Sequence, residues 1–353
     1  MPMPAWSRWL LLPLQVLAVA TGAKSFRDNP VLGHARLNRW GLHLWRKRLA
    51  LRLAAARRRR LAPGIAAADR AAFERDGYLA IPDFLPPAEF ARVRAELLGW
   101  TTPAREFVDG STLTRLIPLD GTALPGLPAT AAALGGARYR GLHDYVGSCR
   151  LPPHLFVQTV FSGVREAPPD VQSHFHSDTF HPTVKSWLFL TEVPGDAAGF
   201  TYVPGSHRPG RRHLAWERRV SVTAAQHADR LTGEGSLRIE EAMLRRLGYP
   251  APRKLAVAAN TLVIADTSGF HRRGISAGSA CRIAIWGYAR GWPFQPWAGI
   301  GRGLRSGRVV RGFWAAQDLL ARLGGRGNGW GWVGDRSPAA PPRLPGEAPG
   351  PAQ

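Results

Sequence analysis

Residues 173–207 read SHFHSDTFHPTVKSWLFLTEVPGDAAGFTYVPGSH, and this stretch decides the fold of the 353-residue chain. The segment 184–193 is rich in Val, Trp, Phe, Leu and Thr, which predicts a strand. A second strand is expected at 200–203, and it runs into the turn sequence Pro-Gly-Ser-His at 204–207. Further strands are expected at 155–161, 261–265 and 281–288. With 30 prolines and 39 glycines in the chain, this pattern predicts a β-rich core with many turns.

Two polar residues stand directly before the first of these strands. His176 and Asp178 are two positions apart, so on extended backbone both side chains point to the same side. Two imidazoles and one carboxylate leave several coordination positions open, and this ligand set suits non-haem iron(II) that activates oxygen. His271, in the later sequence Gly-Phe-His, is the candidate for the third ligand.

Other histidines compete for these roles. His227 and Asp229 repeat the His-x-Asp spacing, but they lie in a polar, helix-prone stretch without a following β-rich run. His174 and His181 also lie near the pattern, where either could be a neighbour of the site or a solvated side chain. His207 is predicted to cap the turn that contains it.

Arg282 opens the last expected strand. The sequence CRIAIWGY alternates, which places Arg282 on the same face as the small Ala284. A guanidinium fork pairs bidentately with a carboxylate, so Arg282 is the candidate partner for the far end of a dicarboxylate co-substrate.

From Ala67 to Arg290 the chain resembles the phytanoyl-CoA dioxygenase family of iron(II)- and 2-oxoglutarate-dependent oxygenases. The resemblance rests on FERDGYLAIPDFLPPAEFARVRAEL at 73–97, on the His-Ser-Asp and Pro-Gly-Ser-His sequences, and on Gly-Phe-His followed by Arg282. It implies a β-rich α+β fold with a double-stranded β-helix (jelly-roll) core and flanking helices.

The resemblance also implies a role for each candidate residue. His176, Asp178 and His271 would hold Fe(II), Arg282 would bind the distal carboxylate of 2-oxoglutarate, and Gln158 would line the co-substrate pocket. Oxidative decarboxylation of 2-oxoglutarate to succinate and carbon dioxide would accompany hydroxylation of a substrate. The carboxylate at 178 separates the chain from halogenating relatives, which lack it. Arginines at 272 and 273 are unusual for the family and concern the substrate more than the metal.

The formal net charge of +22 is concentrated at the amino terminus, where residues 1–60 contain 13 Lys and Arg against the single acid Asp28. A helical stripe of apolar residues within a basic segment predicts attachment to an anionic membrane surface. A solvated tail and nucleic-acid binding are the alternatives, and the second is disfavoured because no nucleic-acid-binding fold is recognised. The stripe consists of Leu42, Trp45, Leu49, Leu53 and Ala56, with Arg46, Lys47, Arg48, Arg52 and Arg57 to Arg60 around it.

The apolar run at 9–23 is too short for a membrane span, which needs about 20 residues. A secretory signal is the rival interpretation of this run. The two cysteines, Cys149 and Cys281, form no disulfide framework and fit a reducing compartment. We therefore expect a cytoplasmic protein that is peripheral on the inner membrane.

The chain divides into four expected parts. Residues 1–62 form the basic membrane-surface segment, and 63–300 form the oxygenase domain. Residues 301–335 form a Gly- and Arg-rich extension with a short helix, and 336–353 form a disordered Pro-rich tail. Within the domain, 101–150 is expected as irregular lid, and 208–255 as an insertion of strand and helix.

Together these patterns predict a dioxygenase that hydroxylates a hydrophobic or lipid-like small molecule. Two other classes remain as alternatives: a metal-binding jelly roll without oxygenase activity, and a basic adaptor for membranes or nucleic acid. The oligomeric state does not follow from the sequence.

Overall fold

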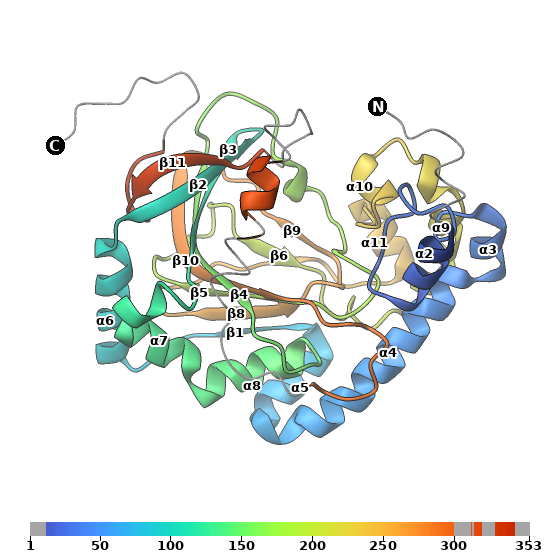
Figure 1. Ribbon diagram of the computed structural model, residues 1–353, viewed down its shortest axis with the longest axis horizontal. Coiled ribbons are helices and arrows are strands. Elements are labelled where there is room, and N and C mark those ends of the chain that lie inside the picture. Colours follow the sequence, from blue (N-terminus) through green and yellow to red (C-terminus); the bar gives the residue numbers. More distant parts are fainter. Residues whose placement is uncertain (1–11, 300–311, 313, 320–328, 343–353) are drawn as a thin grey trace.

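The computed structural model describes residues 12–299, 312, 314–319 and 329–342. In this part of the chain, two antiparallel sheets face each other and helices cover the outside (Figure 1).

The larger sheet contains eight antiparallel strands. Its central strands bury both faces, and neighbouring residues in one strand point to opposite layers of the core. Leu262 and Ile264 face one cluster, while Val263 and Ala265 face the other. In spatial order the strands are β1 (Tyr78–Ile81), β8 (Leu262–Asp266), β5 (Val184–Phe189), β10 (Ala280–Ala289), β4 (His154–Ser162), β3 (Thr112–Pro118), β2 (Thr102–Asp109) and β11 (Gly331–Arg336).

The smaller sheet contains β7 (Arg253–Lys254), β6 (Phe200–Tyr202) and β9 (His271–Arg273). His176 extends this sheet by an isolated bridge to His271. From β4 to β10 the chain passes repeatedly from one sheet to the other and back. This alternation is the double-stranded β-helix expected from the sequence.

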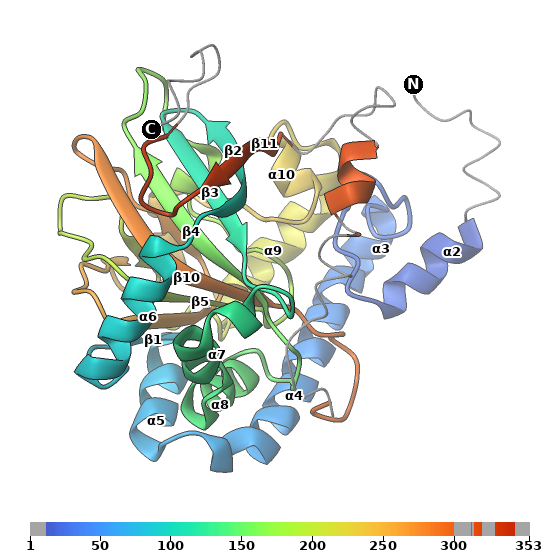
Figure 2. The same ribbon diagram turned by 60° about the vertical axis from the view of Figure 1, so that its left-hand side comes forward.

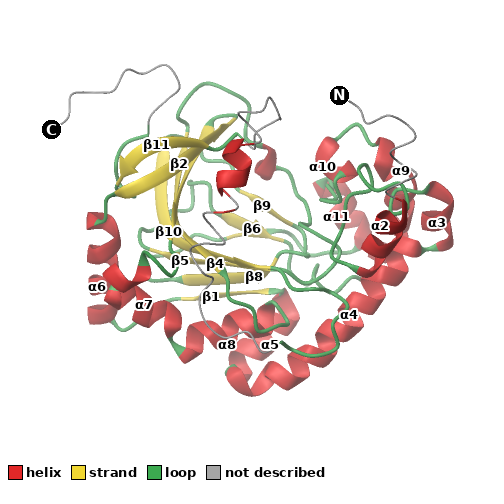
Figure 3. Cartoon of the chain, in the orientation of Figure 1, coloured by secondary structure: helices red, strands yellow, loops and turns green. Residues whose placement is uncertain are grey.

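Helices cover the outer face of the larger sheet (Figure 3). Phe73, Leu97 and Leu142 from three of them are buried against Leu79 and Ile264 of the sheet. The covering helices are α5 (Ala67–Asp76), α6 (Pro87–Gly99), α7 (Pro128–Gly135) and α8 (Ala137–Val146).

A second group of helices lies beside the smaller sheet (Figure 1). The long helix α4 packs against α8 and α9, and α3 packs against α9. This group contains α2 (Leu12–Leu17), α3 (Ala35–Trp40), α4 (Leu42–Leu61), α9 (Arg211–Thr223), α10 (Arg230–Gly233) and α11 (Glu241–Leu247). Short 3-10 helices occur at Ala18–Ala20, Ala62–Gly64, Leu124–Gly126, Val171–Ser173 and Ala224–Gln226.

The five strands expected at 155–161, 184–193, 200–203, 261–265 and 281–288 are present, although β5 ends four residues early, at Phe189. The irregular lid expected at 101–150 is wrong, because this segment forms the β2–β3 hairpin, α7 and α8. A signal for the hairpin was present, since the two-residue loop Gly110-Ser111 between Asp109 and Thr112 starts with glycine, which is favoured there, and Gly110 has φ of +57°.

The insertion at 208–255 is mainly helical, with only the two-residue strand β7 near its end. The sequence HLAWERRVSV lies within α9, where His213, Trp216, Glu217 and Ser221 are buried at helical spacing.

Residues 336–342 have defined structure, whereas disorder was expected throughout 336–353. Arg336 belongs to β11, which pairs with β2, and residues 337–342 lie against Arg115. The Arg115 guanidinium donates to the carbonyl groups of Ser337, Ala340 and Pro341. The expected short helix is seen at 314–319, whereas the rest of 301–328 and the tail from 343 lie largely or wholly outside the described residues.

Several basic side chains of α4 are buried, unlike those of a solvated tail. Arg46, Lys47 and Arg57 are each no more than 3% exposed. Arg46 donates to carbonyl groups of residues 19, 21 and 23, and Arg57 donates to the carbonyl groups of Ser148 and Gln295. The segment that we expected to be a separate surface attachment is therefore packed against the domain. No helix in the described ranges has the length and apolar character needed to cross a membrane.

Candidate metal centre

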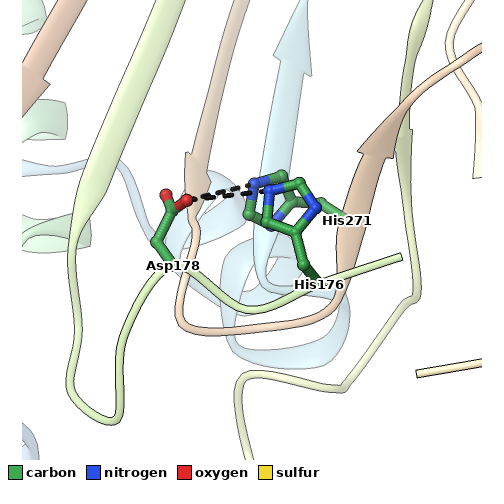
Figure 4. Close-up of side chains that lie close together, drawn as sticks. All are labelled: His176, Asp178 and His271. Carbon is green, nitrogen blue, oxygen red and sulfur yellow. Dashed lines mark ion pairs between the residues drawn. The ribbon is translucent and has the colours of Figure 1, made fainter. Parts of the chain in front are cut away.

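Three side chains converge where the smaller sheet meets the segment before β5. One nitrogen of His176, one of His271 and one carboxylate oxygen of Asp178 all lie within 4.8 Å of one another. Asp178 Oδ1 is 3.8 Å from the Nε2 atom of each imidazole (Figure 4). The three residues that the sequence singled out are thus brought together. No other such group of His, Cys, Asp or Glu occurs in the described part of the chain.

Backbone hydrogen bonds hold the three ligand candidates in place. His176 and His271 exchange two N–H···O bonds, each 3.0 Å long. The N–H group of Asp178 donates to the carbonyl of Thr267 at 2.9 Å. Because the main chain joins His176 to His271, and joins Asp178 to the turn before His271, the site does not depend on side-chain packing alone.

The two imidazoles are oriented by their other ring nitrogen. Nδ1 of His176 donates to the carbonyl of His174 at 2.8 Å, and Nδ1 of His271 donates to that of Gly269 at 3.0 Å. A proton on Nδ1 leaves the lone pair on Nε2, as metal-binding histidines require. Nε2 of His176 is buried and has no hydrogen-bond partner among the described residues, which fits a metal ligand.

The protonation states suit a cation. Burial, together with the neighbouring His271, lowers the pKa of His176 well below its usual value, and burial likewise lowers the pKa of His271. Burial also opposes the charge of Asp178, but the Lys185 ammonium and the two imidazoles outweigh it and hold the pKa of that carboxyl below its usual range. Two neutral imidazoles and one carboxylate are therefore available near neutral pH.

Two lysines at this site were missed by the sequence analysis. Lys185, on β5, places Nζ 2.7 Å from Asp178 Oδ2. Lys24, from the amino-terminal segment, donates to the main-chain carbonyl of Asp178 at 2.7 Å. Nothing in the spacing of Lys24 could have indicated this contact, because the two residues are 154 positions apart.

Asp266 shapes the turn that presents His271. Its Oδ1 accepts from the N–H of Ser268 at 3.0 Å and from the N–H of Thr183 at 3.2 Å. Its Oδ2 accepts from Arg58 at 2.8 Å, so α4 also supports this turn.

A cavity of about 1000 Å³ opens beside the three residues. Gln158, Lys185 and Arg282 contribute polar groups to its wall, together with the two histidines. Oε1 of Gln158 accepts from the indole of Trp187 at 3.3 Å. The remaining wall is mixed, with five aromatic side chains, Phe107, Trp187, Phe200, Trp286 and Trp330, and five further charged ones, Asp109, Arg230, Glu234, Arg272 and Arg273.

Arg282 is the cation of this cavity without a protein partner among the described residues. Burial, with the nearby Arg273, lowers the pKa of Arg282 to about 9, so the group stays charged near neutral pH. Asp170, the closest candidate acid, is already paired with Arg273 at 2.7 Å. The positions of Arg282 and Gln158 agree with their expected roles, which remain predictions.

The remaining candidates lie elsewhere. His174 is exposed, and His207 is buried at the turn after β6, against Phe73. Asp229 of the second His-x-Asp sequence caps α10 through the N–H of Thr232. Arg272 lies over the ring of Phe175, 4.2 Å from its centroid, on the wall of the cavity.

No family model matches the sequence, and no curated protein matches it. Solved structures do show a distant likeness. The epimerase SnoN from nogalamycin biosynthesis, in complex with Fe³⁺, α-ketoglutarate and nogalamycin RO, is 18% identical, with a TM-score of 0.41 over 63% of this chain and 83% of that one.

HygX from Streptomyces hygroscopicus, with nickel, 2-oxoglutarate and hygromycin B bound, is 19% identical, with a TM-score of 0.39 over 70% of this chain and 93% of that one. AviO1 from Streptomyces viridochromogenes Tue57 is 16% identical, with a TM-score of 0.36 over 67% of this chain and 97% of that one. At these values no activity or substrate follows from the likeness.

Proposed function

We propose that this protein is an iron(II)- and 2-oxoglutarate-dependent dioxygenase that hydroxylates a hydrophobic or lipid-like small molecule. One observation carries the proposal. The His176, Asp178 and His271 ligand atoms converge within 4.8 Å, and the two histidines line a cavity that also contains Arg282, which has no protein partner among the described residues. A metal site and a carboxylate site in one cavity are what this chemistry requires.

The residues of the chain have separate tasks in this proposal. Fe(II), held by the two Nε2 atoms and Asp178, would supply oxygen activation. Arg282 would orient 2-oxoglutarate by pairing with its distal carboxylate, and Gln158 would border the same ligand. The Asp178 carboxylate would occupy the coordination position that a halide needs, which favours hydroxylation over halogenation.

The substrate class is inferred from the wall of the cavity. Five aromatic side chains, Phe107, Trp187, Phe200, Trp286 and Trp330, offer a large apolar surface for a hydrophobic body. They would also keep bulk water away from the reacting atoms.

Attachment to the cytoplasmic face of the inner membrane belongs to the same proposal. Trp40 and Trp45 are 78% and 58% exposed, and they border a hollow with Arg48, Arg52 and Arg218. Exposed indoles surrounded by arginines suit the interface of an anionic membrane. This exposed surface is smaller than the apolar stripe expected from the sequence, because much of α4 packs against the rest of the protein.

The first experiment needs no substrate. Purified protein is titrated anaerobically with Fe(II) and 2-oxoglutarate while the visible charge-transfer band is recorded. We expect the band in the wild type, its loss in His176→Ala, and at least about thirtyfold weaker 2-oxoglutarate binding in Arg282→Ala, since a charged hydrogen-bonded pair contributes about 2 kcal/mol.

His174→Ala, at an exposed position two residues before the first ligand, is the matched control and should retain the band. Absence of the band in folded wild-type protein would defeat the proposal. A metal that binds with no effect of 2-oxoglutarate would instead identify a metal-binding jelly roll without oxygenase activity.

A further inference from the structure

A second cavity, of about 780 Å³, lies away from the metal centre. It is formed where the carboxyl-terminal half of α4 meets α5, the end of α8 and the turn after β6. These helices come together at the lower edge of Figure 1 and again in Figure 2. None of its lining residues lines the metal-centre cavity. The proposed oxygenase chemistry therefore does not explain this second cavity.

Four arginines line this second cavity: Arg58, Arg59, Arg70 and Arg208. Among the described residues, Glu74 is the only acidic one that lines it, and Asp266 is the ion-pair partner of Arg58. The two carboxylates offset two of the four guanidinium groups. Two positive charges are left uncompensated within the part of the chain that the structure describes.

The innermost arginine is fixed in place before any ligand arrives. Arg58 donates to the carbonyl groups of Tyr145 and Val146 and to Asp266, and its guanidinium lies 4.8 Å from the centroid of the Phe73 ring. Such a pre-oriented guanidinium loses little freedom when it binds an anion.

His207 completes the polar wall. It is 2% exposed, and its Nδ1 has no hydrogen-bond partner among the described residues because it packs against Gly77. Burial lowers the pKa of this imidazole to about 4, so the ring is neutral near pH 7. With Nδ1 lacking an acceptor, the proton belongs on Nε2, where it can be donated to a ligand oxygen.

Apolar side chains also line the cavity: Leu51 and Ala55 precede Arg58 on α4, Ala62 directly follows α4, and Pro209 comes from the turn after β6. A bare inorganic anion would leave this surface unused. The cavity therefore suits a ligand with both an anionic group and a hydrocarbon part.

We propose that this cavity binds a small organic phosphate, with its phosphate group held by Arg58, Arg70, Arg208 and His207. A phosphate monoester carries a charge of about −1.5 to −2 near pH 7, which matches the two uncompensated charges. Guanidinium forks bind phosphate oxygens in pairs. A soluble monoester presents this charge in full, and a phospholipid headgroup presents similar phosphate oxygens as a singly charged diester.

Calorimetry on the full-length protein tests the proposal. The probes are inorganic phosphate, glycerol phosphate, and vesicles of phosphatidylglycerol or phosphatidylcholine. We expect glycerol phosphate to bind at least as tightly as inorganic phosphate, because its carbon chain adds contact with the apolar side chains. The double variant Arg70→Ala/Arg208→Ala should weaken binding at least tenfold, and Glu74→Gln should tighten it severalfold by removing the opposing charge.

Two controls separate this site from others. Arg246→Ala removes an exposed charge on α11, outside the cavity, and should leave binding unchanged. Arg282→Ala should also leave it unchanged, because Arg282 belongs to the metal-centre cavity. Arg70 and Arg208 form no ion pair in the described part of the chain, and Arg208 donates an exposed hydrogen bond to the main-chain carbonyl of Glu74. Their removal should therefore not unfold the protein, and Glu74→Gln tests the site independently.

The probes distinguish the two sources of phosphate. Binding of glycerol phosphate with the expected variant pattern supports a soluble ester. Binding to phosphatidylglycerol vesicles alone, with the same pattern, supports a headgroup. The proposal is overturned if neither probe binds, if binding survives the double variant, or if Arg246→Ala weakens it equally.

Discussion

The two oxygens of the Asp178 carboxylate have different neighbours. Oδ1 faces both imidazoles at 3.8 Å, and Oδ2 lies 2.7 Å from the ammonium of Lys185. A carboxylate held in this way can offer one oxygen to a metal while the other stays engaged. Monodentate ligation leaves more coordination positions open for a co-substrate and oxygen.

Replacing Lys185 tests this arrangement. Lys185→Met leaves a largely buried carboxylate without its cation, so we expect the free energy of unfolding of the metal-free protein to fall by roughly 1–3 kcal/mol. A divalent cation can replace the lost charge, so Ni(II) should raise the melting temperature more in the variant than in the wild type.

Thermal unfolding with and without Ni(II) measures both effects. Lys254→Met, at an exposed position on β7, is the matched control. Equal stabilisation by Ni(II) in Lys185→Met and wild type would show that the ammonium does not support Asp178.

At the scale of elements, α4 supports the fold through basic side chains that form buried ion pairs and hydrogen bonds. Lys47 and Glu217, on α4 and α9, form an ion pair in which both side chains are no more than 3% exposed. Glu217 also accepts from His43 and His213, and the Lys47 ammonium is chief among the causes that lower its pKa against the opposing effect of burial. The same helix supplies Arg58 to the turn before His271.

Lys47→Met should be strongly destabilising. The change leaves Glu217 as a buried anion without its lysine partner, and breaking a buried pair from one side typically costs about 3–5 kcal/mol. Urea unfolding measures the loss. The double variant Lys47→Met/Glu217→Gln should recover part of it, because no charge is then left unpaired.

Arg48→Met is the control on the same helix, since Arg48 is exposed. Its effect should stay within about 0.5 kcal/mol. A similar loss in Lys47→Met and Arg48→Met would mean that helix propensity, rather than the buried pair, determines the result.

At the scale of the whole molecule, the amino-terminal segment closes over the metal centre. Phe26 is 3% exposed and packs in one cluster with Phe175 and Phe270, the residues that directly precede the two histidine ligands. Lys24 adds its bond to Asp178. Deleting residues 1–60 would therefore remove part of the site as well as any membrane contact.

Phe26→Ala should lower the free energy of unfolding of the protein. Truncation of a buried phenylalanine costs about 3–5 kcal/mol. Because the cluster supports both histidines, we also expect weaker Ni(II) binding in calorimetry. If the variant is destabilised but its metal affinity is unchanged, the packing of the amino-terminal segment does not support the metal site.

The buried histidines make stability depend on pH. Burial lowers the pKa of His143 to about 3, of His181 to about 3 and of His207 to about 4. The unfolded chain binds protons at these residues below about pH 6.5, and the folded chain does not until pH 3–4. Stability should therefore fall as pH drops from 6.5 to 4, by about 1.4 kcal/mol per pH unit for each histidine.

Urea unfolding at pH 7.5, 6 and 5 measures this slope. His143 is hydrogen-bonded to Ser186 and lies away from the metal centre, so His143→Gln should reduce the slope by about one proton. His174→Gln, at an exposed position, is the matched control. If the slope is the same in His143→Gln as in the wild type, the proton uptake occurs at other groups.

The sequence alone determined the central strands of the jelly roll and singled out His176, Asp178 and His271, although it missed the β2–β3 hairpin. Strand periodicity and the His-x-Asp spacing are local properties, whereas His271 was named only as a candidate from elsewhere in the chain. Only the tertiary structure decided that Lys185 and Lys24 flank Asp178 and that α4 buries its basic face. Those contacts join residues far apart in the chain. Whether a lysine meets water, a membrane or a buried carboxylate depends on what packs against it, which no local pattern records.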